Sequence, residues 1–135
     1  MLLGDLLTLR QMRLPVKIVV FNNSSLAFVE LEMKAAGLLD FGTGLENPSF
    51  AEVANASGIL GIRAEQPQDV EPALTRTFAH AGPALVDVVL NRQELSMPPT
   101  IKFGQMAGFG LYIGRAVLNG RADEIIDLTK TNLFR

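Results

Sequence analysis

The sequence has no cysteine among its 135 residues. This absence excludes disulfide scaffolds, thiolate zinc sites, iron–sulfur clusters and cysteine nucleophiles. A chain of this length buries roughly two thirds of the surface that its unfolded form exposes, so it needs no cross-link to fold. With 48% apolar and 19% charged residues, the composition suits one soluble globular domain.

An excess of basic residues is also missing. The 12 Lys+Arg are balanced by 14 Asp+Glu, which gives a formal net charge of -2, and we therefore expect no nucleic-acid partner. A membrane-spanning helix needs about 20 mostly apolar residues, and a signal peptide needs a basic start before its apolar stretch. The sequence shows neither pattern, which favours a cytoplasmic protein.

The residues that are present predict alternating helices and strands. Residues 5–13 carry an apolar helical stripe that Pro15 ends, and residues 16–22 form a strand that is apolar on both faces, as in a central parallel strand. Residues 26–36 predict a helix, and Ser49 caps a short one. A further helix opens at Asp69, with Pro72 in its first turn and Phe78 on its buried stripe. Residues 61–64 and 83–90 predict two more strands.

This element order predicts an α/β fold, an open parallel sheet with helices on both faces and right-handed crossovers. Asp87 is the only break in the apolar run of the last strand. The first helix starts its stripe without a cap or leader, which we interpret as a beginning cut from a longer chain.

The dipeptide of Asn22 and Asn23 lies where the first predicted strand ends. Ligands of open parallel sheets bind at the carboxyl ends of the strands. One interpretation is that the asparagines are turn residues, since their side chains mimic backbone turns. The other is a Mg²⁺ site, because Mg²⁺ prefers oxygen ligands and takes carboxylates and phosphates beside them.

The tail, residues 101–135, is helical in pattern despite several glycines. One interpretation is a last helix packed on the domain. The other is an amphipathic segment that lies in a lipid interface. The apolar residues that such a segment would bury are Ile113, Val117, Ile125, Ile126, Leu133 and Phe134.

Several separated motifs resemble one family in the same order along the chain. They are LPVKIVVFNN at 14–23, SSLAFV at 24–29, EMKA at 32–35, GPALVDVV at 82–89, PPTIK at 98–102 and KTNLFR at 130–135. Together they resemble the carboxyl-terminal part of the pyruvate oxidase, or pyruvate dehydrogenase (quinone), family of thiamine-diphosphate enzymes. The resemblance covers essentially the whole chain.

The resemblance implies a cofactor site. Thiamine diphosphate would be bound through Mg²⁺, with Asn23 as a metal ligand through its side chain and Ser25 through its main-chain carbonyl. The Gly-Asp-Gly half of the family's motif is missing here. Phe28 matches a catalytic residue that moves into the active site on activation. The segment that would line the cofactor comprises Asn23, Ser24, Ser25, Leu26, Ala27, Phe28 and Val29.

The resemblance also implies the whole enzyme's activity. Such an enzyme decarboxylates pyruvate oxidatively to acetate and carbon dioxide, passes electrons through FAD to a membrane quinone, and is a homo-oligomer when complete. Residues 1–93 would belong to the cofactor-binding domain. Residues 94–135 would be a linker and a tail that binds peripheral lipid on the inner face of the cell membrane. This fragment alone should be inactive. The alternative is a non-catalytic α/β interaction module that binds a partner protein or membrane without cofactor.

Overall fold

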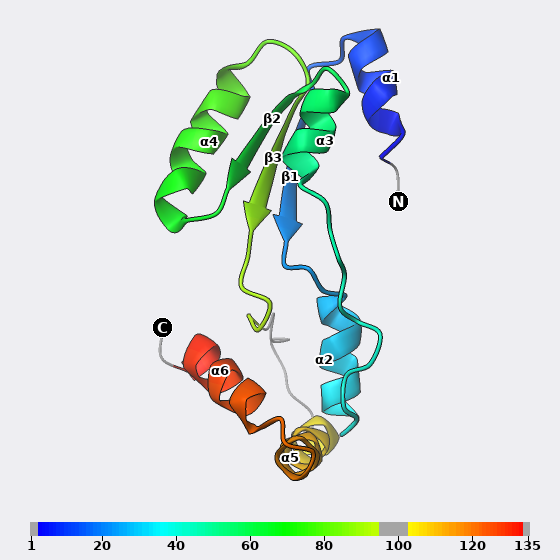
Figure 1. Ribbon diagram of the computed structural model, residues 1–135, viewed down its shortest axis with the longest axis vertical. Coiled ribbons are helices and arrows are strands. Elements are labelled where there is room, and N and C mark those ends of the chain that lie inside the picture. The colour runs from blue at the N-terminus through cyan, green and yellow to red at the C-terminus, as the bar shows by residue number, and fades with distance from the viewer. Residues whose placement is uncertain (1–2, 95–102, 134–135) are drawn as a thin grey trace. The chain divides into compact units, whose positions relative to one another are not determined.

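The computed structural model describes residues 3–94 and 103–133 (Figure 1). Its elements, in chain order, are α1 (Asp5–Met12), β1 (Lys17–Asn22), α2 (Ala27–Ala35), α3 (Phe50–Ala56), β2 (Leu60–Ala64), α4 (Pro67–Ala79), β3 (Ala84–Val89), α5 (Phe103–Leu118) and α6 (Ala122–Leu133). The α/β class and the predicted order of helices and strands are confirmed. Residues 95–102 of the predicted linker, and Phe134 of the predicted lipid face, lie outside the described residues.

The chain forms two compact units. Unit 1 comprises residues 1–23 and 46–90, and unit 2 comprises residues 24–45 and 91–135. Unit 1 therefore contains the three strands with α1, α3 and α4, and unit 2 contains α2, α5 and α6.

The sheet of unit 1 is parallel, with strand order β1-β3-β2. Side chains of a strand alternate between its two faces. On one face Leu85 packs with Leu6 of α1 and Ala54 of α3, and on the other Val86 packs with Ala73 of α4. The expectation of helices on both faces of a parallel sheet is therefore confirmed.

The predicted central position of residues 16–22 is wrong for the described sheet. The central strand is β3, whose residues from Ala84 to Val88 are all buried. The strand β1 pairs with β3 alone among the described strands, and its Phe21 is 71% exposed. Apolar residues on both faces reveal a hydrophobic strand, but they do not reveal which neighbours it has.

Helix α4 corrects two further expectations. It begins at Pro67, because Gln66 and Asp69 form a capping box and Pro67 suits the first helical position. Pro72 therefore lies inside the helix and not in its first turn. The predicted stripe residue Phe78 is exposed, whereas Thr77 is buried and donates its hydroxyl to the carbonyl of Ala73 at 2.7 Å.

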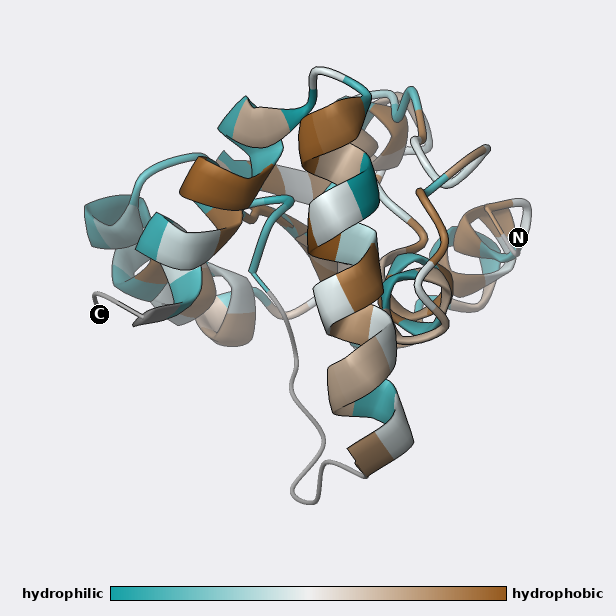
Figure 2. Cartoon of the chain, turned by 90° about the horizontal axis from the view of Figure 1, so that it is seen from below, coloured by the Kyte–Doolittle hydropathy of each residue, from teal (hydrophilic) through white to brown (hydrophobic). Residues whose placement is uncertain are grey.

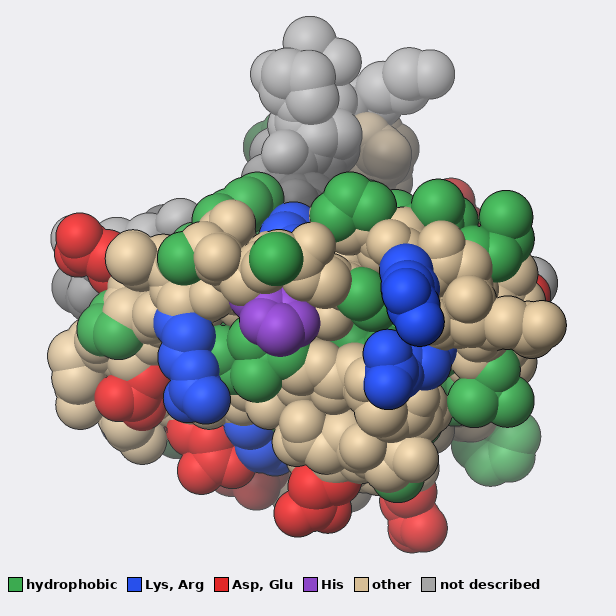
Figure 3. Space-filling view, turned by 90° about the horizontal axis from the view of Figure 1, so that it is seen from above, with side chains coloured by type: hydrophobic (Ala, Val, Ile, Leu, Met, Phe, Trp, Pro, Cys, Tyr) green, Lys and Arg blue, Asp and Glu red, His purple; other side chains and the backbone are tan. Residues whose placement is uncertain are grey.

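Polar contacts at the helix ends of unit 1 involve Ser49 and His80. Ser49 caps α3, and its Oγ accepts the Glu52 N–H at 3.3 Å as expected. His80 is exposed (Figure 3) and is the residue that follows the last turn of α4. Its carbonyl accepts a hydrogen bond from Lys17 Nζ at 2.6 Å.

In unit 2, α5 packs against α2 at a glycine. A Cβ built on Gly108 would overlap the carbonyl oxygen of Ala35, so only glycine permits this close approach. Tyr112 and Ala116, one and two turns further along α5, are completely buried. Apolar residues run the length of α5 (Figure 2). The tail is therefore helical and packed within unit 2.

Candidate functional site

The carboxyl end of β1 is held by a hydrogen-bonded asparagine. Asn22 is 5% exposed. Its Nδ2 donates to Oδ1 of Asp87 at 3.1 Å, and its Oδ1 accepts from Nδ2 of Asn47 at 2.9 Å. Its carbonyl accepts from the Leu90 N–H at 2.9 Å. Asn22 is therefore a structural residue that fixes the end of β1, and the half-buried Asn23 follows it directly.

Asp87 lies at the centre of this edge of the sheet. It has no exposed surface, and its Oδ2 accepts from Nη1 of Arg63 at 2.7 Å and from the Phe50 N–H at 3.1 Å. Burial of an unpaired carboxylate costs several kcal/mol, so the three donors are what make this position tolerable. One side chain thereby joins β1, β2 and the start of α3.

Arg63 supplies the opposite charge. It also pairs with Glu65 at 2.7 Å. The hydrogen bond to Glu65, together with the attraction of Asp87, raises the pKa of Arg63 against the opposing effect of burial. The guanidinium therefore remains charged at every pH at which the protein is folded.

The turn that begins unit 2 contains Ser24 and Ser25. Ser24 has a φ of 52°, in the left-handed region that non-glycine residues seldom adopt. Ser25 forms an isolated antiparallel bridge with Gly44. The main-chain bonds of this bridge come from the residues on either side of the pair. The bridge therefore fixes the turn without using the Ser25 carbonyl.

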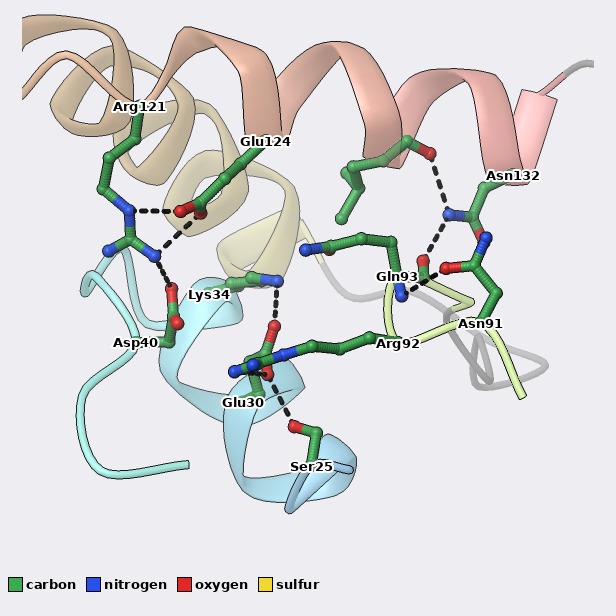
Figure 4. A network of polar contacts seen from close by, with 11 residues as sticks. Ser25, Glu30, Lys34, Asp40, Asn91, Arg92, Gln93, Arg121, Glu124 and Asn132 are labelled. Atoms are coloured by element: carbon green, nitrogen blue, oxygen red, sulfur yellow. Dashed lines mark hydrogen bonds and ion pairs between the residues drawn. The ribbon is translucent and has the colours of Figure 1, made fainter. Parts of the chain in front are cut away.

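A buried ion pair supports the helix that follows this turn (Figure 4). Nζ of Lys34 lies 2.5 Å from Oε1 of Glu30, and both side chains are at most 5% exposed. Ser25 Oγ donates to Oε2 of Glu30 at 2.7 Å, and Arg92 approaches the same oxygen at 3.8 Å. Lys34 Nζ also lies 5.5 Å from the ring centroid of Tyr112, a cation–π distance.

Arginines of the tail bind the loop after α2. Arg121 Nη2 contacts Asp40 and Glu124, each at 2.7 Å, and Arg115 Nη1 donates to the Gly37 carbonyl at 2.6 Å. The hydrogen bond to Glu124 raises the pKa of Arg121, and Asp40 adds to the effect. Figure 4 shows Arg121 between these two carboxylates. The contacts secure α5 and α6 within unit 2.

The predicted site residues are divided between the units. Asn23 ends unit 1, whereas Ser24 to Val29 open unit 2. Ser25 and Ala27 are half-buried, while Leu26, Phe28 and Val29 are exposed, Phe28 by 72%. The predicted roles of these residues in binding metal and cofactor remain predictions.

Sequence reasoning did not assign the partners of Asp87. The available signal was a charged residue inside a buried apolar strand, which is tolerated only when it is paired. Arg63 and Asn47 carried no such signal, because polar residues beside loops are ordinary. Their partnership required the three-dimensional structure.

The part of the chain that the structure describes contains no group of three His, Cys, Asp or Glu side chains that could hold a metal ion. Within the same residues, no helix is both long and apolar enough to cross a membrane.

Comparison with known proteins gives one family. Residues 1–88 match the profile described as thiamine pyrophosphate enzyme, C-terminal TPP binding domain. The chain is 30% identical over 131 residues to YdaP of Bacillus subtilis (strain 168), named a thiamine pyrophosphate-containing protein; the match covers 97% of this chain and 23% of YdaP.

Acetolactate synthases are also similar. The mitochondrial enzyme of Schizosaccharomyces pombe is 30% identical over 95 residues, covering 70% of this chain and 14% of that enzyme. The large subunit of Cyanidium caldarium is 29% identical over 99 residues, covering 71% and 17%. The chain thus spans less than a quarter of the length of these relatives.

Proposed function

The chain belongs to the thiamine pyrophosphate enzyme family, and from this premise we propose that Asn23 would help to hold a Mg²⁺ ion bound together with the cofactor. The observation that carries the proposal is its position. Asn23 directly follows β1, at the carboxyl edge of a parallel sheet, and Asn22 before it is held by Asp87 and Leu90. This is the edge at which such sheets bind ligands.

The donor group of Asn23 at this edge fits Mg²⁺ as part of a shell. The Asp87 carboxylate already accepts from three donors, so it is unsuited to ligate a metal. The Asn23 amide oxygen is a neutral donor of the type that Mg²⁺ accepts beside phosphate oxygens and water, and the family resemblance implies the Ser25 carbonyl as a second neutral donor. When bound, thiamine diphosphate supplies the chemistry of decarboxylation, and the protein supplies binding and orientation.

Calorimetric titration of the 135-residue chain with thiamine diphosphate, with and without Mg²⁺, tests this assignment. We expect Mg²⁺-dependent binding that Asn23→Ala weakens. Asn119→Ala is the matched control, because it removes the same group from an exposed position after α5. Equal binding by the Asn23→Ala and Asn119→Ala variants would contradict the role of Asn23. A longer chain that includes a preceding Gly-Asp-Gly segment should bind more tightly.

For the reaction, we propose oxidative decarboxylation of pyruvate to acetate and carbon dioxide, with electrons passed through FAD to a quinone. The motifs of the sequence support this proposal, and the matched relatives support the use of thiamine pyrophosphate. In this assignment Phe28, on the first turn of α2, enters the active site on activation. The complete enzyme should reduce a quinone with pyruvate, and formation of acetolactate in its place would refute the assignment.

For the tail, we propose contact with a lipid surface at the inner face of the cell membrane. Ile113, Val117 and Ile126 are 39%, 52% and 52% exposed, while Tyr112 and Ala116 fill the inner side of α5. Packing in unit 2 therefore still leaves apolar surface exposed, as an interfacial helix requires.

Vesicle co-sedimentation tests the tail proposal. The double variant Val117→Asp with Ile126→Asp should sediment less with neutral phospholipid vesicles than the unmodified chain, because two charges would enter the interface. Asn119→Asp is the control, since it adds a charge at a site that is already polar. Equal sedimentation of all three proteins would oppose the proposal.

A further inference from the structure

Asp87 is a buried charge whose position is not explained by packing. A leucine, which has the same branched shape, would suit a strand in which the neighbouring residues Val86 and Val88 are 0% and 6% exposed. Replacing a whole buried ion pair by apolar residues is often neutral or stabilising. The carboxylate must therefore do something that an apolar side chain could not do.

The strand register brings its partners together. Asp87 is opposite Val20 of β1 and opposite Arg63 of β2. Side chains two residues apart on a strand share a face, so Asn22 lies on the same face as Val20 and reaches Asp87 diagonally. The carboxylate accepts Asn22 Nδ2 at Oδ1, and Arg63 Nη1 and the Phe50 N–H at Oδ2.

The link to Asn22 is directional. The carboxamide of Asn22 donates to Asp87 on one side and accepts from Asn47 on the other. With both ends bonded, the side chain is held in one orientation, and the bond from the Leu90 N–H holds its carbonyl as well. The main chain therefore leaves β1 toward Asn23 in a defined direction.

We infer that Asp87 is a positioning residue: acting through Asn22, it sets the direction in which Asn23 is presented to Mg²⁺. The inference rests on the proposed function for its ligand, but its structural part does not depend on a bound metal. Asp87 makes two contacts that can be removed separately. Its hydrogen bond with Asn22, the Asn22 arm, positions Asn23. Its ion pair with Arg63, the Arg63 arm, stabilises the sheet.

Three variants separate these arms. Asp87→Leu removes every acceptor. Arg63→Met removes one donor and leaves the bond between Asp87 and Asn22. Asp87→Asn is the conservative variant: if the Asn22 and Asn47 carboxamides both flip, its new NH₂ group donates to Asn22 while its oxygen still accepts from Arg63 and Phe50.

The first measurement needs no cofactor. Hydrogen exchange of the Leu90 amide, which donates to the Asn22 carbonyl, should become about tenfold faster in Asp87→Leu, the equivalent of about 1.4 kcal/mol or one hydrogen bond. The NMR signal of the Asn23 amide should broaden in the same variant. In Arg63→Met and Asp87→Asn, the Leu90 exchange rate and the line width of the Asn23 amide should both stay unchanged. Each of these variants still lowers the melting temperature, because each weakens the charge pair.

The second measurement is the Mg²⁺ affinity in the presence of thiamine diphosphate. Asp87→Leu should weaken it by about tenfold or more, which corresponds to one lost interaction, and Arg63→Met and Asp87→Asn should not. Should Asp87→Leu fail to fold, Asn22→Ala cuts the same arm while Asp87 keeps two donors. It should reproduce the effects on Asn23 and Mg²⁺.

The outcomes separate the two proposals. If the unmodified chain binds no Mg²⁺ with the cofactor, the proposed function fails, and the Leu90 and Asn23 signals still decide the positioning role. If the Leu90 exchange rate and the Asn23 line width change in proportion to the loss of melting temperature in both Arg63→Met and Asn22→Ala, Asp87 is only a structural residue. That result would overturn the inference.

Discussion

Tyr112 offers a direct test of the interior of unit 2. It is the only tyrosine of a chain that has no tryptophan. Its ring has no exposed surface, lies edge-on to Phe109 at 5.9 Å between centroids, and has Lys34 Nζ at 5.5 Å. Among the described residues its hydroxyl has no hydrogen-bond partner. We predict that Tyr112→Phe stabilises the protein and changes its pH dependence.

Both effects can be estimated from the structure. A buried hydroxyl without a partner costs roughly 1–3 kcal/mol, so its removal should raise the free energy of unfolding by about 1 kcal/mol. Burial, with the nearby carboxylates of Glu124 and Asp40, raises the pKa of Tyr112 from 10.0 to about 12. This difference is equivalent to roughly 3 kcal/mol.

The sign of the pH effect follows from the raised pKa. Above pH 10 the unfolded chain releases the phenolic proton while the folded chain still retains it. The unfolded state then binds fewer protons, so stability falls as the pH rises. The contribution of the neutral phenol is complete below pH 10 and is lost as the pH approaches 12.

Tyrosinate absorbance measures this residue alone. The folded protein should titrate near 12 and the urea-unfolded protein near 10. Urea unfolding from pH 9 to 11.5 should show a decline in stability that Tyr112→Phe reduces. Tyr112→Leu is the control: it also removes the ring, so it should destabilise the fold by about 2 kcal/mol or more. A folded-state titration near 10, or an unchanged decline in Tyr112→Phe, would refute the reasoning.

Three further predictions concern stability, each measured as the free energy of unfolding in urea. Gly108→Ala should destabilise unit 2, because the added Cβ would meet the backbone of α2. Gly110→Ala should stabilise α5 by up to about 1 kcal/mol, because nothing lies within 4 Å of its added Cβ. The reverse order of stability would contradict the packing. Lys34→Met leaves the buried Glu30 carboxylate without its main partner and should cost about 3 kcal/mol, with partial recovery on adding Glu30→Gln; no recovery would argue against the pair. Ser49→Ala removes the cap of α3 and should cost about 1 kcal/mol; no loss would show that this cap is not stabilising.

Local signals determined most of the elements. The apolar run of β1, the cap at Ser49 and the apolar run of β3 are all patterns of residues that lie close together in the sequence. Pro72 shows the limit of such signals. A proline favours a first turn, but the capping box of Gln66 and Asp69 begins the helix at Pro67, because a pair of satisfied donors outweighs one missing hydrogen bond.

The candidate site was predicted only in part. Its location followed from the sequence, since an asparagine pair after a buried strand lies at the carboxyl edge of the sheet. The lipid-facing role of Ile126 in the tail stays a prediction, and Leu128, which was not assigned to that face, is a buried residue of α6. Helical periodicity identifies an apolar stripe, but the packing partner selects which residues of it are covered.

The sequence by itself determined the α/β class, the parallel sheet and the position of the asparagines, because periodicity, caps and strand ends are local properties. Only the tertiary structure decided that β3 is central, that Asp87 joins Asn22 to Arg63, and that Lys34 lies under Tyr112. These are pairings between residues far apart in the chain. Any suitable donor can satisfy a buried charge. The partner is therefore decided by which residues the tertiary structure brings beside that charge.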